Sequence, residues 1–138
     1  MTTRPNNFQE RLDLFLQEKR AEPFAWGVND CCLFACDWVA ILTGRDLASD
    51  LRGYPSALAA WRLVKKLGGV EQIASDRCAL NGWPEVRITM ATQGDVVSCD
   101  TRHGPALGVC FGHICAFPGP RGIVFRKLLE CRKAWRIL

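Results

Sequence analysis

WGVNDCCLFACDWV, residues 26–39, joins a glycine-containing loop to a segment that is apolar nearly all round. Its Asn-Asp pair is a good helix cap, so we predict a helix from Cys31 to about Leu42, ended by Gly44. Asp37 is the only charged residue in that helix, which is typical of a helix buried on most sides. The sequence therefore predicts a central helix that begins at a cysteine.

Outward from this helix, the first half of the chain has helical patterns and the second half has strand patterns. A surface helix capped by Asn6 or Asn7 is expected to run to about Arg20. Further helices are expected near residues 55–68 and 70–78, and strands near residues 95–99, 106–111, 114–117, 122–125 and 134–138. The connections between strands are too short for crossovers, so the sheet should be antiparallel. We predict one α+β domain spanning residues 1–138.

Composition excludes several classes of protein. The 138 residues are 49% hydrophobic and carry a net charge of +4, without the concentrated Lys/Arg stripe of a nucleic-acid binder. No segment approaches the roughly 20 apolar residues of a membrane span, and the polar start MTTRPNNFQERLDLF is unlike a secretory signal. We expect synthesis in a cytosol, with neither membranes nor nucleic acids as partners.

The cysteine that begins the central helix is the main candidate for chemistry. Free N–H groups and the helix dipole at that end favour a thiolate, which attacks carbonyl groups, and the same N–H groups can hold an oxyanion. Cys32 points about 100° away around the helix and should pack inside with Cys36. The simpler interpretation makes Cys31 a small buried residue beside a helix cap. For the other seven of the eight cysteines, we favour buried free thiols.

These segments resemble the NlpC-like, papain-related cysteine peptidases of bacterial cell walls. In that family a Trp/Tyr-Gly segment leads into Asp-Cys at a helix start, a Gly-Asp-Val-Val segment follows, and a later strand begins with histidine. The resemblance places Cys31 on the nucleophile, residues 94–97 on the Gly-Asp segment and residues 106–112 on the histidine strand. The chain is most similar to a divergent branch associated with the tails of bacteriophages and gene-transfer particles. The resemblance implies a papain-like NlpC-type fold and tail-tip hub proteins as partners.

One departure from the family pattern concerns the general base. On this alignment Ala106 takes the place of the histidine, and the Ser-Gly after the nucleophile is replaced by Cys32-Leu33. His103 lies three residues before Ala106, so a loop bend is needed to bring its imidazole to Cys31. His113 belongs to a predicted Gly112-His113 turn, roughly 20 Å along a strand from position 106.

Other groups of residues give weaker signals. The cysteine spacings contain no Cys-x-x-Cys pair, so we expect no metal or other cofactor. Trp26 is a candidate wall of a substrate groove, and Asp30 a candidate site-lining residue together with Cys32. Two interpretations of Asp95 and Asp100 stay open: they orient a base, or they are turn and strand-edge residues. A basic group is either a solvated face or a docking surface for an acidic protein: Arg126, Lys127, Arg132, Lys133 and Arg136.

Two functions are consistent with these residues, and a third is a minor alternative. The first is a phage-tail-associated peptidase that cleaves amide bonds of peptidoglycan through a Cys31 thioester, with His103 as the base. The second is a catalytically inactive structural or assembly component of a tail tip with the same fold, which Ala106 favours. A thiol redox or metal protein is the third class. In the first two cases the protein would be made in the host cytoplasm and end in the virion tail.

Overall fold

The computed structural model describes residues 3–138, and the first half of that range is helical. The helices are α1 (Phe8–Lys19), α2 (Leu33–Thr43), α3 (Ala57–Lys66) and α4 (Val70–Leu80). All four lie where the sequence predicts helices, but α2 begins two residues after Cys31. Gly44 ends α2 in the left-handed conformation, at φ 78°, as predicted. Ser56 caps α3, because its hydroxyl accepts a hydrogen bond from the Ala59 N–H at 3.1 Å.

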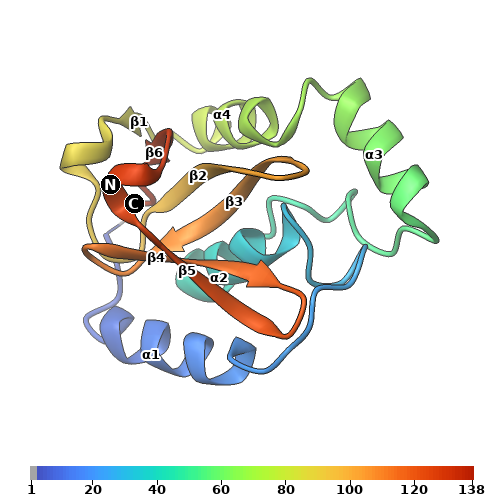
Figure 1. The fold of residues 1–138 in the computed structure, drawn as a ribbon. Helices are drawn as coiled ribbons and strands as arrows, with labels where there is room; N and C mark the ends of the chain where they lie inside the picture. The colour runs from blue at the N-terminus through green and yellow to red at the C-terminus, as the bar shows by residue number, and fades with distance from the viewer. Residues whose placement is uncertain (1–2) are drawn as a thin grey trace.

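The second half forms a six-stranded sheet in which every neighbouring pair is antiparallel, as predicted (Figure 1). Its order is β1-β6-β2-β3-β4-β5. The strands are β1 (Glu85–Val86), β2 (Val96–Thr101), β3 (Gly104–Cys110), β4 (Ile114–Gly119), β5 (Gly122–Lys127) and β6 (Lys133–Trp135). The two-residue β1 and the 3₁₀ turns η1 (Ile88–Met90) and η2 (Leu128–Glu130) were not predicted, because such short elements carry no periodicity. The chain is therefore α+β.

The two faces of the sheet bury different sets of residues. On β2 and β3, Val96, Leu107 and Val109 pack with α1, α2 and α4 in the larger core. The alternate residues of the same strands, including Val97 and Ala106, belong to a smaller cluster on the other face. Helix α3 lies away from the sheet, beyond the hairpin of β2 and β3 (Figure 1). The larger core thus fixes α2 against the middle of the sheet.

Helix α2 is central and buried, as its apolar sequence predicts. Phe34 and Trp38 are fully buried. Phe15 of α1 packs against both rings, with centroid separations of 5.2 and 5.7 Å. The Trp38 Nε1–H donates to the Gly94 carbonyl oxygen at 2.9 Å, just before β2. This bond and the aromatic packing tie α2 to α1 and to the sheet.

A buried carboxylate holds the start of β2. Asp95 is fully buried and accepts hydrogen bonds from Arg4, from Arg136 at 3.0 Å and from the Thr92 N–H at 2.9 Å. Arg4 precedes α1 and Arg136 follows β6, so one carboxylate joins both ends of the described chain to the sheet. Asp95 is therefore structural and does not orient a catalytic base.

We predict that Asp95→Asn destabilises the protein by about 3 kcal/mol, since it leaves two arginines facing a neutral buried amide. The matched control is Asp100→Asn, because Asp100 also pairs with an arginine but its side chain is 61% exposed. That control should cost less than about 1 kcal/mol. Urea unfolding of both variants measures the difference, and equal losses would contradict the structural role of Asp95.

Candidate functional site

The segment before α2 is shaped by the buried Asp30 carboxylate. Its Oδ1 accepts hydrogen bonds from the N–H groups of Cys32 at 3.0 Å and Leu33 at 2.9 Å, and its Oδ2 accepts from the Gly27 N–H at 2.9 Å. The Phe34 N–H donates to the Asp30 carbonyl at 3.3 Å, so helical bonding starts at Asp30. Asp30 is thus a cap, and it occupies two of the N–H groups that the sequence suggested for an oxyanion.

Gly27 allows the loop before Cys31 to approach a neighbouring loop, at residues 53–54. Gly27 has φ 77°, and a Cβ there would lie 2.4 Å from the Tyr54 backbone nitrogen. The Gly53 N–H donates to the Gly27 carbonyl oxygen at 2.9 Å. The Tyr54 hydroxyl is buried without a hydrogen-bond partner. The Trp26-Gly27 segment is therefore pressed against residues 53–54, which brings Trp26 next to Cys31.

Cys31 opens onto a surface groove of about 340 Å³. Cys31 is half-buried, whereas Trp26 and Trp61 on the groove walls are 40% and 56% exposed. Glu71 of α4 is its one ionisable carboxylate. The full lining is Trp26, Cys31, Ala60, Trp61, Val64, Gly68, Gly69, Val70, Glu71 and Pro105. The groove is mostly apolar and large enough for a side chain or a short peptide segment.

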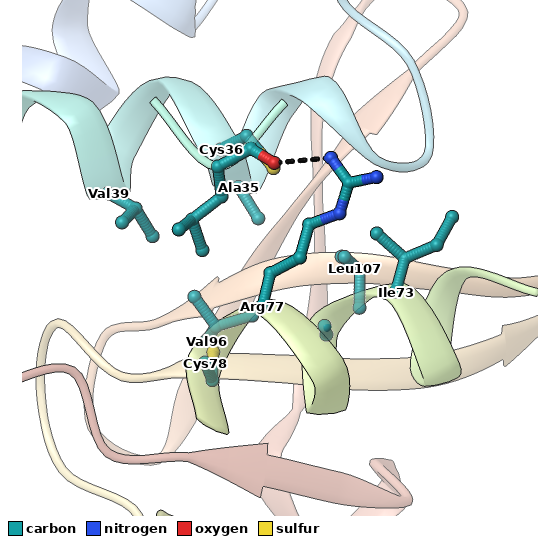
Figure 2. A pocket seen from close by; sticks show the side chains of 10 residues that line it. Ala35, Cys36, Val39, Ile73, Arg77, Cys78, Val96 and Leu107 are labelled. Carbon is teal, nitrogen blue, oxygen red and sulfur yellow. Dashed lines mark hydrogen bonds between the residues drawn. The ribbon is translucent and has the colours of Figure 1, made fainter. Parts of the chain in front are cut away.

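A second cavity, between α2, α4 and the sheet, is not a ligand site. Its volume is about 10 Å³, which is room for a single water molecule. Figure 2 shows its apolar lining and the Arg77 side chain, which donates to the Leu47 carbonyl oxygen at 2.7 Å. The Cys31 groove is therefore the better candidate for binding.

The predicted thiolate at Cys31 is not what the structure supports. Burial, followed by the Asp30 carboxylate and the neighbouring Cys32, raises the pKa of the Cys31 thiol to about 12. Only the backbone of Cys31 itself acts in the opposite direction on this pKa. The prediction was wrong because the fold buries most of the sulfur, and because the capping carboxylate brings a negative charge to the same helix end as the dipole. At neutral pH Cys31 is a protonated thiol.

The strand aligned with the family histidine does lie beside Cys31. The Leu107 N–H donates to the Cys31 carbonyl oxygen at 2.7 Å, and Cys31 packs against the cluster that contains the buried Ala106. His103 lies in the exposed two-residue turn between β2 and β3, and its imidazole is not part of the groove lining. His113 lies in the β3–β4 turn, as predicted. Neither histidine is brought to the groove.

The remaining sequence candidates have structural surroundings. Cys32 is buried in the larger core together with Cys36, as the sequence predicts. Asp100 pairs with Arg132 at 3.0 Å, and Arg132 also lies 3.3 Å from Glu71. Arg136 is bound to Asp95. Two of the five basic residues near the end of the chain are thus already paired within the domain, which weakens the docking interpretation.

Sequence reasoning missed three residues at or behind the groove. Trp61 and Glu71 come from α3 and α4, and Tyr54, whose buried hydroxyl has no hydrogen-bond partner, lies against Gly27 of the loop before Cys31. Trp61 is an apolar residue of α3 that lies outside the buried face of that helix, where only Ala60 is buried. No local sequence pattern marks Glu71 as a groove residue, because its position depends on how α4 packs against β2. The Ser98 hydroxyl of β2 donates a hydrogen bond to the Glu71 carboxylate at 2.6 Å.

We predict that Asp30→Asn speeds alkylation of Cys31 at pH 9. The amide keeps an acceptor oxygen and removes the charge that raises the pKa of the thiol. The rate should rise by up to about tenfold, which corresponds to one pKa unit. In the unmodified protein the rate should keep rising toward pH 12 instead of levelling near 9. Asp37→Asn, which removes a charge farther along α2, is the control. Equal rates in both variants would rule out Asp30 as a cause.

Comparisons with known proteins identify a family without an assigned activity. No curated protein matches this chain. Within residues 3–138, no helix is long and apolar enough to cross a bilayer, and no group of three His, Cys, Asp or Glu side chains is arranged to hold a metal ion. A family profile described as a domain of unknown function, DUF6950, matches residues 3–137. Because the match spans nearly the entire chain, this protein belongs to the DUF6950 family.

Proposed function

We propose that this chain is an NlpC-like, papain-related domain of a phage-tail-associated protein, and that it acts as an assembly component rather than as an efficient peptidase. The observation that carries the proposal is a groove-facing Cys31 next to a strand whose family-histidine position is Ala106. A nucleophile and its base must lie within hydrogen-bond reach, and a methyl group accepts no proton.

Several features support the papain-like part of this proposal. Cys31 lies two residues before a buried helix, that helix packs on an antiparallel sheet, and β3 contacts the cysteine backbone through the 2.7 Å bond from Leu107. The groove opens at the same point. The family resemblance of residues 26–39, 94–97 and 106–112 supports the same arrangement. That resemblance alone supports the association with a tail tip and its hub proteins.

The surroundings of Cys31 argue against rapid hydrolysis. The pKa of its thiol is raised to about 12, so very little thiolate exists at neutral pH. The N–H groups of Cys32 and Leu33 are held by Asp30 and are not free for an oxyanion. Loss of a general base typically costs about 10²–10⁴-fold in rate. The groove thus retains the shape of a binding site without a catalytic proton shuttle.

The open groove favours a second candidate function, a peptidoglycan amidase or peptidase. In that case the Cys31 sulfur attacks a stem-peptide carbonyl, the amine leaves with a proton, and water cleaves the resulting thioester. His103 would have to move from the β2–β3 turn to supply the proton transfer. The 340 Å³ volume beside the sulfur is the specific feature in favour of this candidate.

Zymography on purified bacterial cell walls separates the two candidates. We expect no clearing by the unmodified protein, nor by Cys31→Ala or His103→Ala, because no imidazole serves the thiol. Co-purification with a tail hub protein, unchanged in Cys31→Ala, is the expected positive result. Clearing that is lost in Cys31→Ala would establish the peptidase instead. Loss with His103→Ala as well would identify the base.

A gain-of-function variant tests the geometry directly. Ala106→His should place an imidazole beside Cys31 and increase alkylation of that thiol at pH 7 by about tenfold or more, since a nearby cation favours the thiolate. Ala106→Gln, which is of similar size and neutral, is the matched control. Circular dichroism checks that both variants fold. A folded Ala106→His protein with an unchanged rate would show that position 106 does not serve this sulfur.

A further inference from the structure

Two tryptophans of the Cys31 groove are held by neighbouring side chains. The Trp26 ring meets the Phe24 ring edge-on, with the ring centroids 4.8 Å apart. The Lys65 Nζ lies over the Trp61 ring of α3, 4.6 Å from its centroid. Trp26 and Trp61 nevertheless remain 40% and 56% exposed. Partly exposed aromatic residues beside a pocket are those that anchor partner side chains at interfaces. The groove can therefore accept an apolar side chain of a ligand.

Glu71 adds a hydrogen-bonding position to the groove. Its Oε2 accepts a hydrogen bond from the Ser98 hydroxyl at 2.6 Å and lies 3.3 Å from the Arg132 Nε. Within residues 3–138 no hydrogen bond reaches its Oε1. The Arg132 guanidinium partly offsets the negative charge of this carboxylate. The second oxygen can therefore accept an N–H group from a peptide backbone, which offers such donors along its length.

The helix that carries Trp61 is basic. Helix α3 contains Arg62, Lys65 and Lys66 and no acidic residue. None of these three residues takes part in an ion pair within residues 3–138. Residues four apart on a helix are neighbours, so Lys65 follows Trp61 along one side and Lys66 follows Arg62 along the next. The rim of the groove thus has positive charge that the domain itself leaves uncompensated, and this charge complements an acidic ligand.

The shape of this surface favours a peptide over a membrane. A lipid surface is flat, whereas the groove is a recess of about 340 Å³ into which a single side chain fits. Helix α3 has only Leu58 and Trp61 as exposed large apolar residues, at 54% and 56%. It lies away from the sheet (Figure 1), so one side of the groove is formed by a helix that a partner can approach along its length.

We propose that the Cys31 groove docks an extended acidic segment of a partner protein. One apolar side chain of the segment enters the groove against Trp26 and Trp61, a backbone N–H donates to Glu71, and flanking carboxylates pair with Arg62 and Lys65. This inference rests on the proposed role of the domain as an assembly component, and it adds the chemistry of the segment that the domain binds. No covalent step at the sulfur is needed.

The test uses the full chain and three fluorescein-labelled peptides. We expect Glu-Glu-Phe-Glu-Glu to bind about tenfold more tightly than Lys-Lys-Phe-Lys-Lys, because the rim is positive. It should also bind about tenfold more tightly than Glu-Glu-Gly-Glu-Glu, which lacks the apolar anchor. Fluorescence polarisation measures each Kd, and this comparison needs no variant. Raising NaCl from about 50 mM to about 500 mM should weaken the acidic peptide several-fold, since salt screens exposed charges.

Variants with matched controls locate the binding site. Trp61→Ala should weaken the acidic peptide about tenfold, and Lys65→Glu by a similar factor. Leu80→Ala is the control for the first change, because Leu80 is 85% exposed at the end of α4 remote from Glu71. Arg45→Glu is the control for the second, because Arg45 follows α2 at the end remote from Cys31. Both controls should leave Kd within about twofold.

Several outcomes would overturn the inference. They are equal affinity for the acidic and basic peptides, an equal loss of affinity in the controls, and binding to phosphatidylglycerol vesicles without binding of the acidic peptide. Retention of a hub protein by a chain that binds no acidic peptide would reject this inference and leave the assembly role intact. Cell-wall clearing that is lost in Cys31→Ala would instead reject the assembly role, while tight binding of the acidic peptide would still support the docking site.

Discussion

The buried Asp30 carboxylate is the interaction on which the candidate site depends. Its two oxygens accept N–H groups from both sides of the loop, at Gly27 on one side and at Cys32 and Leu33 on the other. A buried carboxylate without such bonds would be very costly, so the loop and the first turn of α2 are held in one conformation. That conformation places Cys31 between the Trp26 wall of the groove and β3.

The same interaction limits what the cysteine can do. A helix start ordinarily favours a thiolate because its N–H groups carry partial positive charge. Here the charge of those groups is already compensated by Asp30, and the carboxylate adds its own repulsion to the cost of burying the sulfur. Asp30 therefore fixes the position of Cys31 and, together with burial, lowers the acidity of its thiol. A counter-charge on the other side of the sulfur would reverse this balance, and Ala106 supplies none.

The regular elements could be predicted from sequence because their signals are local. The apolar run of α2, the stop at Gly44 and the tight turn at Gly112-His113 each depend on neighbouring residues, and each is found in the structure. The sign of the Cys31 pKa shift could not be predicted, because it depends first on how deeply the fold buries the sulfur and then on the orientation of the Asp30 side chain. The groove wall at Trp61 and Glu71 depends on how α3 and α4 pack, which no local pattern encodes.

The eight cysteines illustrate the same limit in another way. Sequence reasoning singled out Cys31 for its place at a helix start and treated Cys131 as a small buried hydrophobe. In the folded chain Cys131 is half-buried, packs against a cluster that contains three other cysteines, and donates its S–H to the Lys127 carbonyl oxygen at 3.6 Å. Thiol reactivity follows from neighbours and access rather than from local sequence. Its position at a helix start therefore does not by itself decide how reactive Cys31 is.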